Sequence, residues 1–173
     1  LGKYHWLYGF AGSTVYGYKK EKNSLKENII MVIGDGMIAK RFGKYAEDEN
    51  ILVFASGVSN SSSTIVADYE REETLLLNCL KEHTNKTLVY FSTCSIYDPS
   101  LQQSNYVMHK LKMEQLIQSR AFSYIIFRVS NPVGFTNNKH TVLNFFIQHI
   151  TSGEPFTVWQ YASRNLIDMD DVL

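Results

Sequence analysis

The chain has no excess of charge of either sign. Lys and Arg together number 17 and Asp and Glu together number 17, so the formal net charge is zero. A protein that binds nucleic acid or another polyanion over a broad surface needs a positive electrostatic field. The balanced charge therefore argues against a nucleic-acid partner.

Cysteines and long apolar runs are also scarce. The two cysteines, Cys79 and Cys94, show no paired spacing, so we expect reduced thiols and a cytoplasmic protein. No apolar run reaches the length of a membrane span and the N-terminus shows no signal-peptide pattern, so we expect no membrane association. The five histidines lack the spacing of metal ligands, so we expect no metal site.

The length and composition of the chain are typical of a globular domain. The 173 residues are 45% hydrophobic and 20% charged, and this length predicts one domain with a substantial core. Residues 1–27 do not share the pattern of the rest, because an aromatic and glycine-rich stretch is followed by a basic, polar one. They could form an arm, a hairpin or a leader. We expect residues 28–173 to form the folded domain.

A glycine-rich turn opens this domain. The apolar run 29–33 predicts a buried strand, and Gly34-Asp35-Gly36-Met37-Ile38-Ala39 follows it directly. Gly-x-Gly-x-x-Ala between a strand and a helix is typical of dinucleotide binding, because the pyrophosphate lies on the helix N-terminus. Gly34 would permit the tight turn, and Gly36 would let phosphates approach the backbone. The alternative is an ordinary turn that uses glycine for its positive φ.

Strands and helices alternate along the rest of the chain. This order predicts an α/β fold with a doubly wound, Rossmann-like parallel sheet. We expect further strands at 51–55, 87–91, 123–129 and 156–159. We expect helices from the end of the glycine motif at Ala39 to about Tyr45, and at 65–82, 106–118 and 141–151.

The cofactor half of this sheet is shortened in the sequence. Only the polar turn 47–50 separates the first helix from strand 51–55, which carries no acidic residue at its carboxyl end. A dinucleotide-binding unit normally has a strand there that ends in an acidic residue for the adenosine ribose. We therefore expect a truncated sheet.

A hydroxyl-rich segment and a Tyr-Lys pair suggest a proton-transfer site. Strand 87–91 runs into Ser92-Thr93-Cys94-Ser95, and ligands bind at the carboxyl ends of such strands. Tyr106 and Lys110 then project from one helix face. Tyr-x-x-x-Lys also occurs at Tyr16/Lys20 and Tyr18/Lys22, but only the third pair follows a strand with a hydroxyl.

A hydroxyl, a tyrosine and a lysine in this arrangement suit one kind of chemistry, the transfer of a proton to or from a substrate oxygen. A tyrosine acts as a base near neutral pH only if positive charge lowers its pKa from about 10. Lys110, together with a nicotinamide cation, would supply that charge, and Thr93 would orient the substrate oxygen. The alternative is a surface Tyr-Lys pair and a strand-end hydroxyl that bonds the backbone.

The ordered motifs resemble the short-chain dehydrogenase/reductases, in particular the extended branch of nucleotide-sugar epimerases, dehydratases and reductases. Thr93–Tyr97 is similar to the Ser/Thr-x-x-Val-Tyr of this branch, and Tyr106 and Lys110 match its Tyr-x-x-x-Lys. Three further segments resemble the branch's Ala-Ala-Gly, Arg-x-x-Asn-x-x-Gly and Arg-Asp-x-Ile-x-Val-x-Asp-Val motifs, namely residues 55–57, 128–134 and 164–172.

The resemblance implies a role for each matching residue. The catalytic residues would be Thr93, Tyr106 and Lys110. NAD or NADP would be held by the last two and by Gly34, Asp35, Gly36, Met37, Ile38, Ala55, Ser56 and Gly57. A nucleotide-sugar substrate would contact Ser95, Asn131 and Arg164. The implied reaction is sugar epimerisation or ketosugar reduction, and a homodimer would form through the helices at 65–82 and 105–118.

Departures from the family pattern keep two alternatives open. The family's Gly-x-x-Gly-x-x-Gly falls on Ile33, Gly36 and Ala39, its second and third strands find no counterpart, and the C-terminal substrate domain is expected to be rudimentary or absent. A non-catalytic dinucleotide-binding or scaffold protein is the first alternative. A reductase of a small carbonyl compound is the second.

Overall fold

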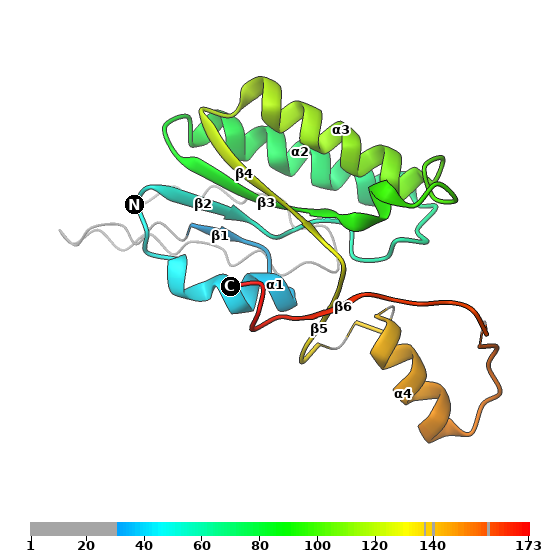
Figure 1. The fold of residues 1–173 in the computed structure, drawn as a ribbon. Coiled ribbons are helices and arrows are strands. Elements are labelled where there is room, and N and C mark those ends of the chain that lie inside the picture. Colours follow the sequence, from blue (N-terminus) through cyan, green and yellow to red (C-terminus); the bar gives the residue numbers. More distant parts are fainter. Residues whose placement is uncertain (1–30, 137, 140, 159) are drawn as a thin grey trace, which may run out of the picture.

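The computed structural model describes residues 31–136, 138–139, 141–158 and 160–173 (Figure 1). The expectations for residues 1–27, for the two other Tyr-Lys pairs and for the first two residues of strand 29–33 lie outside the described residues. The end of the strand expected at 156–159, Trp159, lies outside them too.

Four parallel strands form the main sheet, as the alternating pattern predicts. They are adjacent in chain order: β1 (Val32–Ile33), β2 (Ile51–Phe54), β3 (Thr87–Thr93) and β4 (Ser123–Val129). In the register, Val32 pairs with Val53 and the whole of β3 pairs with β4. Because β1 and β2 are direct neighbours, the turn between Tyr45 and Ile51 adds no strand between them, as expected.

Helices cover both faces of this sheet, which makes it doubly wound (Figure 1). On one face lie α2 (Val66–Glu82) and α3 (Asn105–Arg120), and their Leu76, Met113 and Ile117 pack on Phe54 and Leu88. On the other face, the short α1 (Met37–Arg41) continues into the 3-10 helix η1 (Phe42–Tyr45).

The second face has a smaller core. Phe42 of η1 packs there against Phe91 of β3, with ring centroids 4.9 Å apart. Val53 of β2 and Val89 of β3 belong to the same cluster. Burial on both faces explains why β2 and β3 are continuous apolar runs.

Local sequence signals set the helix ends. Ser104 Oγ accepts a hydrogen bond of 3.3 Å from the Val107 N–H and so caps α3. Thr141 caps α4 (Val142–Ser152) in the same way, with 3.4 Å to the Asn144 N–H. Gly153, with φ of +70°, ends α4 in the left-handed conformation that glycine favours.

A second, two-stranded sheet was not predicted. β5 (Asn131–Val133) pairs in parallel with β6 (Leu166–Asp168), and α4 lies in the segment between them (Figure 1). The prediction of a strand at 156–159 was wrong for residues 156–158, which the structure describes and which form no strand. Phe156 packs instead against α4, with 5.6 Å between its ring centroid and that of Phe146. Its apolar side chain therefore covers this helix and takes no part in a sheet.

Candidate active site

Thr93 and Tyr106 come together at the carboxyl end of β3. Thr93 is the last residue of β3, and its Oγ1 accepts a hydrogen bond of 3.1 Å from the Ser95 N–H and lies 3.1 Å from Ser95 Oγ. Ser95 belongs to the 3-10 helix η2 (Cys94–Tyr97). Tyr106 lies in the first turn of α3 and forms a hydrogen bond with Thr93. This hydrogen bond lowers the pKa of Tyr106, but burial and the charge of Glu72 raise it by more.

Lys110 lies one turn further along α3, but its ammonium group turns toward the protein interior. Its Nζ lies 5.9 Å from the centre of the Tyr106 ring, and the residue is only 2% exposed. The ammonium donates to Glu72 Oε1 at 2.9 Å, to the Tyr90 hydroxyl at 3.0 Å and to the Phe91 carbonyl at 3.5 Å.

Glu72 is the centre of this buried cluster. It comes from α2, is fully buried, and accepts hydrogen bonds from the Val58 N–H and the Tyr90 hydroxyl, both at 2.7 Å. His109 Nε2 lies 3.2 Å from Glu72 Oε2 without the alignment of a full hydrogen bond. Burial alone would raise the pKa of Glu72, but His109, Lys110 and Tyr90 together hold it well below its ordinary value.

Burial, nearby charges and a hydrogen bond all act on the pKa of Tyr106. Burial raises the pKa of Tyr106 to about 12, and the negative charge of Glu72 adds to this rise. The positive charge of Lys110 is offset by the negative charge of Glu72, 2.9 Å away.

The glycine turn leaves room for a phosphate group. Gly34 has φ of +125°, and a Cβ there would lie 2.5 Å from the Ala55 carbonyl oxygen, so only glycine fits. Around Gly36, the N-cap of α1, nothing lies within 4 Å of an added Cβ. Asp35 is exposed, and Met37 and Ile38 are half-buried behind it. An open backbone beside a tight turn fits the pyrophosphate of a dinucleotide.

The segment after β2 closes over Lys110. Ala55 donates its N–H to the Ile33 carbonyl at 2.7 Å, which places it beside the glycine turn. Ser56 accepts two hydrogen bonds from Arg71, both 3.1 Å long. A Cβ on Gly57 would lie 2.7 Å from Lys110 Nζ. The predicted contact between Lys110 and the cofactor stays a prediction.

The second sheet brings the two predicted substrate motifs together. Asn131 of β5 donates through Nδ2 to the Asn165 carbonyl at 3.1 Å, and Arg164 precedes Asn165. Arg164 is exposed. Hydrogen bonds from Ser100 lower the pKa of Asp98, and the positive charge of Arg164 contributes a smaller decrease.

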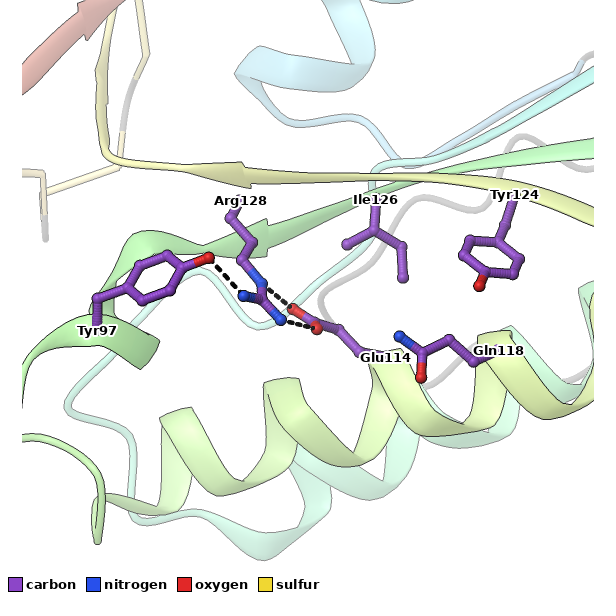
Figure 2. A pocket seen from close by; sticks show the side chains of 6 residues that line it. All are labelled: Tyr97, Glu114, Gln118, Tyr124, Ile126 and Arg128. Atoms are coloured by element: carbon purple, nitrogen blue, oxygen red, sulfur yellow. Dashed lines mark hydrogen bonds and ion pairs between the residues drawn. The ribbon is translucent and has the colours of Figure 1, made fainter.

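Arg128, the first residue of the Arg-x-x-Asn motif, does not lie with Asn131 and Arg164 but binds a buried carboxylate. Arg128 binds the buried Glu114 through two nitrogens, at 3.0 and 2.6 Å, and reaches the Tyr97 hydroxyl at 2.5 Å. Figure 2 shows these contacts in an open pocket of about 460 Å³ between α3 and β4, lined by Tyr97, Glu114, Gln118, Tyr124, Ile126 and Arg128. None of the predicted site residues lines this pocket, so we assign it no part in the chemistry.

Glu72, Tyr90 and His109 are the site residues that sequence reasoning missed. Glu72 stands in the helix expected at 65–82, beside other charged residues of that helix. A signal was nevertheless present, because Leu76 and Cys79 follow Glu72 at the i+4 and i+7 positions of one buried helix face. Among the described residues, no three His, Cys, Asp or Glu side chains form a metal-binding group. No helix in the described ranges is long and apolar enough to cross a membrane.

Comparisons with known proteins identify the family of this chain. The model of the NAD dependent epimerase/dehydratase family matches residues 12–173. One solved structure, the capsular polysaccharide assembling protein CapF from Staphylococcus aureus, is 20% identical with a TM-score of 0.48. That match covers 71% of this chain and 34% of CapF, so the chain spans about a third of that protein's length. A comparison with curated proteins found no match. On the family match, the chain belongs to the NAD dependent epimerase/dehydratase family.

Proposed function

We propose that the chain is an NAD(P)-dependent enzyme that moves a hydride between a nicotinamide and a carbon of a nucleotide-linked sugar, as an epimerase or a ketosugar reductase. One observation carries this proposal. The open glycine turn after β1 and the Thr93–Tyr106 pair after β3 lie at the carboxyl ends of strands in one parallel sheet. In open α/β sheets this edge is where ligands bind.

The residues of the glycine turn would hold the cofactor. Gly34 to Ile38 would face the pyrophosphate, and Ala55, Ser56 and Gly57 would line the adjacent wall. When bound, the nicotinamide accepts or supplies the hydride. Tyr106 would transfer the proton of the reacting oxygen, and Thr93 would fix the position of that oxygen by a hydrogen bond.

The paired strands β5 and β6 support a nucleotide-sugar substrate. Asn131 and Arg164 lie near each other through the Asn131–Asn165 hydrogen bond, and Arg164 carries an exposed guanidinium. A guanidinium binds a diphosphate through paired, charge-assisted hydrogen bonds. Ser95, next to Thr93, would contact the sugar.

Calorimetric titration with NAD(H) and NADP(H) tests the cofactor part of the proposal. We expect binding in the wild type and weaker binding in Gly36→Val, whose side chain would occupy the open space at the turn. Gly43→Val is the matched control, because Gly43 also has open space around it but lies in η1, outside the glycine turn. An absence of binding at millimolar cofactor would favour the scaffold alternative.

Turnover measurements test the chemistry. With a panel of UDP- and dTDP-linked sugars, Tyr106→Phe should abolish any conversion that the wild type performs, because it removes the transferred proton. Unchanged turnover in this variant would show that Tyr106 has no such role. Arg164→Ala should weaken substrate binding at least tenfold if the substrate carries a diphosphate. If the substrate is a small carbonyl compound, Arg164→Ala should leave binding unchanged.

A further inference from the structure

Strand β4 forms one edge of the main sheet. Its seven residues pair with β3 along one side, and no strand of the described ranges pairs with its other side. An edge strand presents a row of unpaired N–H and C=O groups, which is a template for pairing with another chain. Proteins that avoid such pairing shorten the edge strand or place lysine, proline or a bulge there. Residues 123–129 contain no lysine or proline, and their register with β3 has no bulge.

Both faces of this strand carry apolar side chains that the fold leaves uncovered. On the face away from α3, Ile125 is 46% exposed and Phe127 is 39% exposed. On the face toward α3, Tyr124 and Ile126 point into the open pocket of Figure 2. A further strand at this edge would therefore cover apolar groups on both faces of the sheet.

We propose that β4 pairs in antiparallel orientation with β4 of a second copy of this chain, about a two-fold axis at Ile126, so that the two main sheets become one continuous sheet. This surface differs from the helices at 65–82 and 105–118, through which the family resemblance implies a homodimer. The proposal does not depend on the proposed function.

The sequence of β4 is complementary to itself in this register. Each side chain then meets one of compatible chemistry, and the opposite pairs are Ile126 with itself, Ile125 with Phe127, Tyr124 with Arg128 and Ser123 with Val129. All seven residues of the strand are paired, and opposite side chains lie on the same face with their Cβ atoms about 4.5–5.5 Å apart. An aromatic side chain opposite a β-branched one stabilises an antiparallel pair of strands. The two-fold axis forms each contact between different residues twice.

The charge of β4 also fits a second copy. Arg128 is its only charged residue, and it binds Glu114 through two nitrogens, so the pairing brings no like charges face to face. The Arg128 guanidinium lies 5.2 Å from the centre of the Tyr97 ring, and its side chain is still 34% exposed. Tyr124 of the second copy would reach this guanidinium from the open side of the pocket, and an aromatic ring binds such a cation over its face. The second copy would thus occupy part of the pocket of about 460 Å³.

Analytical ultracentrifugation of the whole chain tests this interface. The wild type should be a dimer at micromolar concentration, and Ile125→Lys should raise the dimer dissociation constant at least about tenfold, because a lysine on an edge strand opposes pairing. Ile125 is the site of the substitution because it is exposed, whereas Ile126 packs on the core. Met108→Lys is the matched control, since Met108 is 54% exposed on α3, and it should leave the dimer intact. A monomeric wild type, a dimer that survives Ile125→Lys, or loss of the dimer in Met108→Lys would overturn the proposal.

A mixture of two variants tests the register. Phe127→Glu should weaken the dimer as Ile125→Lys does. In a heterodimer of these two variants, the introduced lysine lies opposite the introduced glutamate, while the other pair keeps Phe127 opposite Ile125. The equimolar mixture should therefore dimerise at least about tenfold more tightly than either variant alone. An absence of recovery in the mixture would overturn the antiparallel register about Ile126.

Hydrogen exchange of the wild type keeps the test valid if these variants do not fold. Over the concentration range in which the dimer forms, the amides of residues 123–129 should exchange more slowly as the concentration rises. The amides of α2 should show no such change. Protection that rises in α2 and α3 but stays constant in β4 would place the interface on the helices and overturn the proposal.

Discussion

Lys110 Nζ lies 2.9 Å from Glu72 Oε1, and neither side chain is more than 3% exposed. The pair joins α2 to α3 on the same face of the sheet. A buried ion pair adds little stability over well-packed apolar residues, but the loss of one partner leaves an uncompensated charge and is costly. The pair therefore matters most for where Lys110 points and for the charge that reaches Tyr106.

Removal of one partner should destabilise the protein strongly. We expect Glu72→Ala to lower the free energy of unfolding by about 3–5 kcal/mol, because it leaves Lys110 buried without its carboxylate. Urea unfolding measures the change. Glu73→Ala is the matched control, since Glu73 joins the same two helices through an exposed pair with Lys112 at 2.6 Å and should cost at most about 1 kcal/mol. Equal losses in the two variants would contradict the prediction.

Acid should destabilise the fold through Glu72. The folded pKa of this carboxyl is depressed, so its contribution to stability is fully present above the ordinary pKa of 4.5 and is lost as the pH falls toward the folded value. The free energy of unfolding should therefore decrease below about pH 4.5 in the wild type. Glu72→Gln should show a shallower decrease over the same range. Parallel curves for the two proteins would show that Glu72 does not carry this pH dependence.

The two glycines of the turn should respond differently to alanine. Gly34→Ala forces a side chain into a left-handed backbone and against the Ala55 carbonyl, and should cost about 1–3 kcal/mol. Gly36→Ala meets open space and ordinary backbone angles, so its cost should stay below about 1 kcal/mol. Thermal unfolding of the two variants measures which substitution lowers the stability more. A larger loss in Gly36→Ala would mean that the turn is built differently.

Arg128 should matter for stability and not for catalysis. Arg128→Ala leaves Glu114, which is 3% exposed, with Ser92 Oγ at 2.6 Å as a remaining hydrogen-bond donor. We expect a loss of about 1–3 kcal/mol in chemical denaturation. The control Arg128→Ala/Glu114→Leu should recover part of this loss, because no buried carboxylate remains. If the double variant is less stable than the single one, the Arg128–Glu114 pair does not have this role.

The sequence predicted the frame of the molecule well. Strand β4 was predicted at Ser123–Val129, where it occurs, and the helix expected at 106–118 corresponds to α3. Both rest on short-range physics, namely an apolar run with flanking turns and a hydroxyl before a helix. The predicted meeting of Thr93 and Tyr106 followed in the same way, because strand ends in a parallel sheet share one edge.

The contacts of Lys110 could not be predicted from local pattern. Which acceptor a lysine chooses depends on residues far apart in the chain, and Glu72 is 38 positions away from Lys110. The motif at Tyr106 and Lys110 describes spacing on one helix and carries no information about a carboxylate on another. For the same reason the pairing of β5 with β6 was missed, since each strand is only three residues long and has no distinct apolar run.

The distance along the chain between β5 and β6 has a consequence for the order of assembly. Glu72, Tyr90, Thr93, Tyr106 and Lys110 have all been synthesised before β5, whereas Asn131 waits for Asn165, 34 positions later. Chains are made from the N-terminus and domains begin to fold as they emerge. The cluster around Glu72 and the Thr93–Tyr106 pair can therefore form while β6 has not yet been synthesised. The sheet of β5 and β6 is added to this frame last, so changes in β6 need not disturb the frame.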